Sequence, residues 1–117
     1  MKKLFISVPM RDRTEEQICY SIEKMHKIAN AVFDENFAVI NSYNPELKDI
    51  PPIDALGKTI SLMTEADYFI GIGYSSMLYC GCTIETEVAQ SYGIPNYMIN
   101  VDWVLTPEER PKESGAE

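Results

Sequence analysis

The chain has 117 residues, about the length of one ordinary domain. Its 18 acidic residues outnumber the 10 basic ones and give a formal net charge of −8. This acidity argues against a polymeric nucleic acid as partner, because binding a phosphate backbone needs a basic stripe. With 45% hydrophobic and 24% charged residues, the composition is that of a folded globular domain and excludes a disordered chain.

The cysteines and the apolar runs of the chain indicate its cellular compartment and whether it binds a metal. Cys19, Cys80 and Cys82 are odd in number, the apolar run after Met1 is too short for a signal peptide, and no run reaches the roughly 20 apolar residues of a membrane span. We therefore expect free thiols in a cytoplasmic protein that does not enter a membrane. The Cys80-Gly-Cys82 spacing lacks the second Cys/His pair of a zinc site, so no metal is expected.

Apolar patterns predict four strands that alternate with three helices. Residues 3–8 form a short, nearly unbroken apolar run that ends at Pro9, which is typical of a strand covered on both faces. Thr14 and Gln17 have capping-box spacing, and apolar residues then recur at helical spacing, which predicts a helix from Thr14 to Asp34. The later elements are expected as strand, helix, strand, helix and strand over residues 37–40, 54–66, 67–73, 82–92 and 95–100.

This alternation predicts one α/β domain over residues 1–105, of the flavodoxin or Rossmann-like kind. We expect three layers and a parallel sheet of about four strands in the order 2-1-3-4. Residues 106–117 hold two prolines and six charged residues without an apolar period, and we expect a loosely held tail. Trp103 and Leu105 are expected to anchor that end on the domain or on a second subunit.

Ligands of open parallel sheets bind outside the carboxyl ends of the strands, where the strand order reverses. In the predicted sheet this crevice lies between the first and third strands, beside the loops 7–13 and 73–81. Arg11 and Arg13 are two of the three arginines of the chain, and they make the first loop locally basic. The second loop leads into a helix N-terminus, which favours anions.

A helical wheel places Glu85 on the apolar arc of the third predicted helix, whereas Glu87 falls on its polar face. The other members of the arc are Ile84, Val88, Ala89 and Tyr92. Burying a carboxylate without partners is costly, so Glu85 must be paired or functional. We expect the helix N-terminus to keep it ionised, which suits nucleophilic attack or stabilisation of a positive sugar centre. A capping or ion-pairing role, for instance with Arg11, is an equal alternative.

Three weaker patterns are not assigned a ligand. Gly57-Lys58-Thr59 lacks the earlier glycine of a P-loop, and Gly71-Ile72-Gly73 lacks the third glycine of a dinucleotide fingerprint, so we expect no cofactor. His26 lies at the edge of an apolar stripe with no serine or cysteine one turn away. We interpret it as a boundary histidine whose ring is hydrogen-bonded.

Several segments together resemble the nucleoside 2-deoxyribosyltransferase-like superfamily, which includes the 2′-deoxynucleoside 5′-phosphate N-hydrolases. They are Leu4-Phe-Ile-Ser-Val-Pro-Met10, Glu65-Ala-Asp-Tyr-Phe-Ile70, and Gly81-Cys-Thr-Ile-Glu85 with Ala89 and Gly93-Ile-Pro95. The resemblance covers residues 3–99 and is nearest to small bacterial and phage members. It implies that Glu85 attacks the anomeric carbon of a nucleoside or nucleoside 5′-monophosphate and releases the base. Water or a second base then resolves the glycosyl-enzyme.

The same resemblance implies a set of substrate-binding residues. Gly81 matches a glycine that lets the backbone approach the ligand, and Arg11 matches a place where basic groups hold phosphate. Thr59 and Tyr79 depart from the family, which carries aspartate at the first position and aspartate or serine at the second. The implied binding set is Ser7, Pro9, Met10, Arg11, Thr59, Tyr79 and Gly81. The resemblance also implies a homodimer or larger assembly.

Two other functions are weighed beside cleavage or exchange of an N-glycosidic bond. One is a non-catalytic nucleotide-binding module, a sensor or ligand sponge, in which Glu85 contacts a ribose hydroxyl. The other is an interaction domain on the same scaffold, since this architecture hosts many functions. In that last case side chains such as Tyr79 would fill the crevice.

Overall fold

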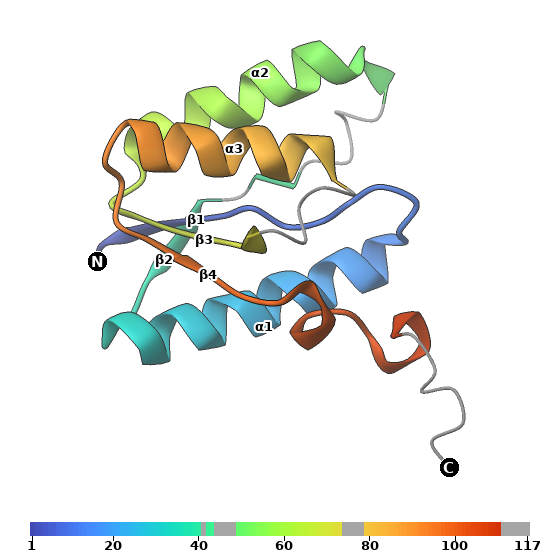
Figure 1. Ribbon diagram of the computed structural model, residues 1–117, viewed down its shortest axis with the longest axis horizontal. Coiled ribbons are helices and arrows are strands. Elements are labelled where there is room, and N and C mark those ends of the chain that lie inside the picture. The colour runs from blue at the N-terminus through green and yellow to red at the C-terminus, as the bar shows by residue number, and fades with distance from the viewer. Residues whose placement is uncertain (41, 44–48, 74–78, 111–117) are drawn as a thin grey trace.

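The computed structural model describes residues 1–40, 42–43, 49–73 and 79–110. Four parallel strands form one sheet in the order β2-β1-β3-β4, which confirms the predicted topology (Figure 1). β1 is central: Leu4 lies opposite Val39 on one neighbour and Tyr68 on the other. The strands are β1 (Lys3–Ile6), β2 (Ala38–Ile40), β3 (Tyr68–Gly71) and β4 (Asn96–Met98).

Three helices cover the sheet as an α/β/α sandwich, so the Rossmann-like, three-layer prediction is confirmed. α1 (Glu15–Phe33) lies on one face, and α2 (Pro52–Leu62) and α3 (Cys80–Ser91) lie on the other (Figure 1). The predicted capping box starts α1: Thr14 Oγ1 accepts a hydrogen bond from the Gln17 amide, and the Gln17 side chain accepts one from the Thr14 amide.

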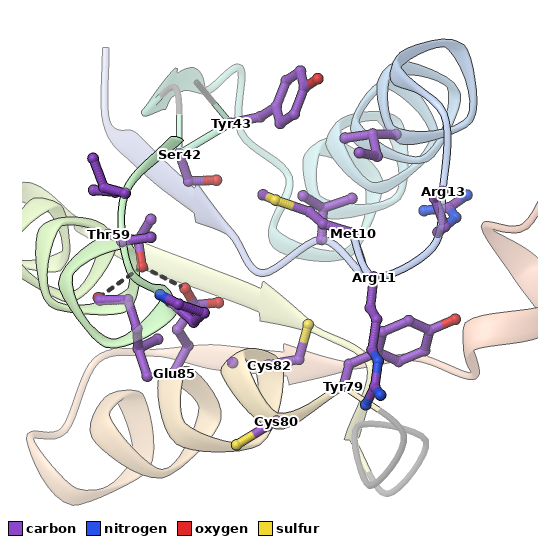
Figure 2. Close-up of a pocket in the computed structure, with 17 residues that line it drawn as sticks. Met10, Arg11, Arg13, Ser42, Tyr43, Thr59, Tyr79, Cys80, Cys82 and Glu85 are labelled. Carbon is purple, nitrogen blue, oxygen red and sulfur yellow. Dashed lines mark hydrogen bonds between the residues drawn. The ribbon is translucent and has the colours of Figure 1, made fainter. Parts of the chain in front are cut away.

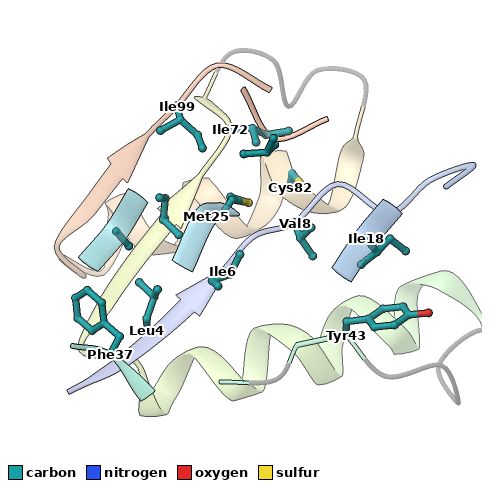
Figure 3. Close-up of a cluster of buried hydrophobic side chains, with 13 residues drawn as sticks. Leu4, Ile6, Val8, Ile18, Met25, Phe37, Tyr43, Ile72, Cys82 and Ile99 are labelled. Atoms are coloured by element: carbon teal, nitrogen blue, oxygen red, sulfur yellow. The ribbon is translucent and has the colours of Figure 1, made fainter. Parts of the chain in front are cut away.

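Successive side chains of β1 point to opposite faces of the sheet. Leu4 and Ile6 pack with Met25 of α1 in one hydrophobic cluster (Figure 3). Phe5 points the other way and stacks on Phe69 in a second cluster, with ring centroids 5.8 Å apart and nearly parallel rings. Both faces are therefore covered, which explains why β1 is apolar from Leu4 to Ile6 instead of alternating.

Three helix boundaries differ from the predicted ones, and the first is the start of α2, which lies at Pro52 instead of residue 54. α3 starts at Cys80, two residues before the predicted start, and residues 74–78 of the predicted preceding loop lie outside the described residues. The second predicted helix ends as a tighter 3₁₀ turn, Met63–Glu65. Tyr92 is wrong as a member of the inward arc: it caps the end of α3 and is 81% exposed.

The expectation of a loose tail is wrong for residues 106–110. Thr106 is buried, and Glu109 of a 3₁₀ turn binds Arg13 near the start of α1. Residues 111–117 of the predicted tail lie outside the described residues. Of the two predicted anchors, Leu105 is buried and Trp103 is 58% exposed, so only the leucine docks on the domain.

Candidate functional site

A cavity of about 500 Å³ lies beyond the carboxyl end of β1, beside the strand-order reversal, but its described lining extends to the segment after β2 and includes none of residues 68–73 of β3 and its end (Figure 2). Its walls come from the segment after β1, the start of α1, the segment after β2, α2 and the first turns of α3. Most of the lining is apolar, including Val8, Met10, Ile18, Tyr43, Ile50 and Leu56. The volume is in the range of small-molecule sites.

Glu85 brings a carboxyl group to this apolar cavity and is only 8% exposed. Ser7, directly after β1, donates a hydrogen bond from Oγ to Glu85 Oε1 at 2.7 Å. Thr59 of α2 lies with Oγ1 at 2.9 Å from Glu85 Oε2 (Figure 2). Ser7 is 78 positions and Thr59 is 26 positions away from Glu85 in the sequence. The fold therefore brings the segment after β1, α2 and α3 together at one carboxyl group.

The pKa of Glu85 is raised above its ordinary value of 4.5, mainly because burial disfavours the charged form. The hydroxyls of Ser7 and Thr59 oppose this effect. The expectation that the helix N-terminus keeps the carboxylate ionised is wrong. Since α3 starts at Cys80, Glu85 lies in its second turn, beyond the free amides of the first.

Ion pairing does not explain Glu85 either. Arg11 Nε lies 3.9 Å from Asp12 on the surface, and none of the ion pairs formed by the described residues includes Glu85. Capping is excluded by its place in the second turn of α3. The hydroxyls of Ser7 and Thr59 are the groups that pair with the buried carboxyl group.

Only one of the two arginines expected to make the first loop basic is available to a ligand. Arg13 is buried, with its side chain 2% exposed, and its donors are used by Glu109 and by the carbonyl of Pro9. Arg11 points its side chain to solvent, 76% exposed, while still lining the cavity. Among the described lining residues, Arg11 is therefore the one cation accessible to an anionic ligand.

The structure brings most of the predicted binding residues together. Met10, Arg11, Thr59, Tyr79, Gly81 and Glu85 all line the cavity. Ser7 is not among the lining residues and reaches the site through its hydrogen bond to Glu85. Pro9 is buried, and its carbonyl accepts a hydrogen bond from Arg13. Gly81 belongs to the first turn of α3, not to a loop, and a Cβ there would meet only Leu56 Cδ1, at 3.8 Å.

Sequence reasoning missed the wall that follows β2. Ser42 and Tyr43 line the cavity, and the Ser42 hydroxyl donates to the carbonyl of Ile6 at 3.1 Å. Their place after a strand carboxyl end could have flagged them. Cys82 was also missed, although it lies three residues before Glu85 on the same face of the helix. Burial raises the pKa of Cys82 to about 12, which makes its thiol a poor nucleophile.

The remaining patterns stay outside the site. His26 is a boundary histidine as predicted, with Nε2 3.1 Å from the carbonyl of Phe37. All three cysteines are free, Cys19 and Cys80 exposed and Cys82 buried. Over the described ranges, no three His, Cys, Asp or Glu side chains gather to hold a metal ion, and no helix is long and apolar enough to cross a membrane.

The chain was compared with protein-family models, with curated proteins and with solved structures, and none of the three gives a match. What the site can do chemically therefore follows from its own geometry. A sheltered carboxyl group held by two hydroxyls can attack an electrophilic carbon, stabilise a positive centre or hydrogen-bond a ligand hydroxyl. The apolar walls suit a largely uncharged part of a small molecule.

Proposed function

We propose that the cavity binds a nucleoside or nucleoside 5′-monophosphate and that Glu85 cleaves or exchanges its N-glycosidic bond. The observation that carries this proposal is the buried Glu85 carboxyl group in an apolar cavity at the switch point of the sheet. The apolar walls would take the base, and the carboxyl group would face the sugar. A 5′-phosphate would reach Arg11 at the exposed edge of the cavity.

The proposed reaction has two steps. The ionised carboxylate of Glu85 forms a bond to the anomeric carbon while the carbon–nitrogen bond breaks, and the base leaves with the electron pair and takes up a proton from solvent. Water or a second base then attacks the same carbon and displaces the carboxylate. Ser7 and Thr59 orient the carboxyl group through the hydrogen bonds at 2.7 and 2.9 Å.

The test is release of free base, measured by chromatography. The purified protein is incubated with deoxynucleosides, ribonucleosides and their 5′-monophosphates, with and without a second base. We expect base release by the wild type, none by Glu85→Ala, and wild-type rates for Glu87→Gln, an exposed carboxylate on the same helix. Equal inactivity of the wild type and Glu85→Ala over the whole panel would refute the proposal.

A non-catalytic nucleotide-binding module is the second candidate, and the hydrogen bonds from Ser7 and Thr59 that hold the buried Glu85 favour it. A carboxyl group held in this way is a good hydrogen-bond partner for ribose hydroxyls. This candidate predicts heat of binding in calorimetry without base release. Glu85→Gln would then keep its affinity within a few fold, because the amide keeps a carbonyl oxygen that accepts a hydrogen bond from a ribose hydroxyl.

We also propose a homo-oligomer in a reducing compartment such as the cytoplasm. The cavity opens to solvent beside Arg11, where a second subunit could cover it. Exposed free thiols at Cys19 and Cys80 suit a reducing setting. Sedimentation at micromolar concentration is expected to show a dimer or larger species, and a monomer would contradict the assembly.

A further inference from the structure

We propose that Thr59 is a positioning residue whose hydroxyl changes its hydrogen-bond acceptor with the protonation state of Glu85. Thr59 Oγ1 lies 2.9 Å from Glu85 Oε2 and also 2.9 Å from the carbonyl oxygen of Leu56 (Figure 2). A hydroxyl has a single hydrogen and donates to one of these acceptors at a time. The acceptor to which Thr59 donates depends on whether Glu85 carries a proton.

In the protonated state every one of these contacts is a good hydrogen bond. The Glu85 carboxyl group donates from Oε2 to Thr59 Oγ1, and Thr59 donates to Leu56. Ser7 Oγ donates to Oε1 and does so in either state. A chain of three groups is thus satisfied with one proton on the carboxyl group.

In the ionised state the hydroxyl of Thr59 turns to the carboxylate. The Leu56 carbonyl then loses its side-chain donor, but it lies inside α2, where a helix pairs each carbonyl with an amide four residues on. Thr59 and Glu85 are both buried, so unpaired groups there would be costly. The switch leaves neither state with an unpaired carboxyl oxygen.

The other ionisable groups of the cavity do not take over this role. They are Arg11 and Arg13 before α1, Tyr43 after β2, and Tyr79, Cys80 and Cys82 at the start of α3, whereas the lining residues of α2 include none. Arg13 is paired with Glu109, and the raised pKa of Cys82 keeps its thiol neutral. Thr59 is therefore the described side chain whose hydrogen-bond acceptor depends on the charge of Glu85, whereas Ser7 donates to Glu85 in either state.

The consequence for catalysis rests on the proposed function. Attack needs an ionised carboxylate, the glycosyl ester is uncharged, and the second step restores the charge. Thr59 can donate to the charged form and turn back to Leu56 when the charge disappears. The hydroxyl switch itself is a property of the ligand-free protein, so it can be tested without substrate.

The first test uses the wild-type protein. The side-chain carboxyl ¹³C shift of Glu85 and the methyl ¹³C shift of Thr59 are followed by NMR as the pH is varied. We expect both to titrate with one midpoint above 4.5, and Glu85→Gln to abolish the titration of Thr59. A Thr59 methyl group that does not respond at the midpoint of Glu85 would overturn the proposal.

The second test uses variants with a matched control. Thr59→Val is expected to raise the pKa of Glu85 by about one unit, because the ionised form loses a charge-assisted donor, and Thr59→Ser to restore it to within a few tenths. The control is Thr64→Val, because Thr64 also donates to the carbonyl three residues before it and, within the described residues, has no hydrogen bond to a carboxyl group. An unchanged pKa in Thr59→Val, or equal values in the valine and serine variants, would refute the switch.

Base release is measured on the same samples, so the two proposals fail separately. A linked titration without base release would keep the role of Thr59 and reject N-glycosidic cleavage. Base release without a pH response of the Thr59 methyl group would keep N-glycosidic cleavage and reject the role of Thr59.

Discussion

Arg13 and Glu109 form a two-pronged ion pair that joins segments 96 residues apart. Arg13 Nε and Nη2 donate to the two carboxylate oxygens of Glu109, both at 2.7 Å, and Nη1 donates to the carbonyl of Pro9 at 2.6 Å. The side chains of the pair are 2% and 14% exposed. The C-terminal turn is thereby fastened to the loop that carries Met10 and Arg11 into the cavity.

Removal of this carboxylate is expected to destabilise the fold. Glu109→Gln leaves the buried guanidinium of Arg13 without its counter-charge, and we expect a loss of about 2–4 kcal/mol in the free energy of unfolding, measured with urea. Glu108→Gln alters the neighbouring exposed carboxylate and should change stability by less than about 0.5 kcal/mol. Equal stability of the two variants would show that the ion pair contributes nothing.

The same pair predicts a pH dependence of stability. The hydrogen bonds from Arg13 lower the pKa of Glu109 from 4.5 to about 2. Because the folded-state pKa is the lower one, the stabilisation is complete above about 4.5 and is lost as the pH falls toward 2. Over that window the wild type should lose stability more steeply than Glu109→Gln. Parallel curves for the two proteins would contradict this assignment.

The amino-acid sequence predicts the sheet order and helix faces because the apolar runs and the capping box are local signals. It also selects Glu85, whose helical spacing from Ala89 places it on the buried face. The partners of Glu85 could not be found this way: Ser7 is 78 residues away, and the hydroxyl of Thr59 meets the carboxyl group only after α2 and α3 pack together. The prediction that Arg13 makes the cavity loop basic is wrong for the same reason. Its partner Glu109 lies in a stretch without an apolar period, so the sequence does not indicate that this stretch folds back onto the domain.

Thiol labelling tests the architecture of the cavity. Cys19 and Cys80 are exposed and should react with a maleimide in the folded protein, whereas buried Cys82, with its pKa raised to about 12, should react only after unfolding. Cys80 lines the cavity and Cys19 does not. A bound nucleoside should therefore slow labelling of Cys80 alone, as read by peptide mass spectrometry. Equal protection of Cys19 and Cys80, or fast labelling of Cys82, would count against this cavity.

A substitution at Gly81 is expected to weaken ligand binding without lowering the stability of the fold. A Cβ at this position makes an ordinary 3.8 Å contact with Leu56, so Gly81→Ala should keep or raise stability by up to about 1 kcal/mol. The added methyl group narrows the cavity and should weaken nucleoside binding by about tenfold, near 1.4 kcal/mol. Gly57→Ala is the control, since among the described residues a Cβ there meets nothing within 4 Å and Gly57 is not part of the cavity lining. Unchanged affinity in Gly81→Ala would place the ligand elsewhere.

The most direct measurement is the mass of the Glu85 peptide after the reaction is stopped with acid. If Glu85 is the nucleophile, part of the wild-type protein will carry one sugar unit as an ester on that peptide, while Glu87→Gln behaves identically and Glu85→Gln releases no base. Base release with no sugar on the peptide, together with full activity of Glu85→Gln, would contradict the central claim.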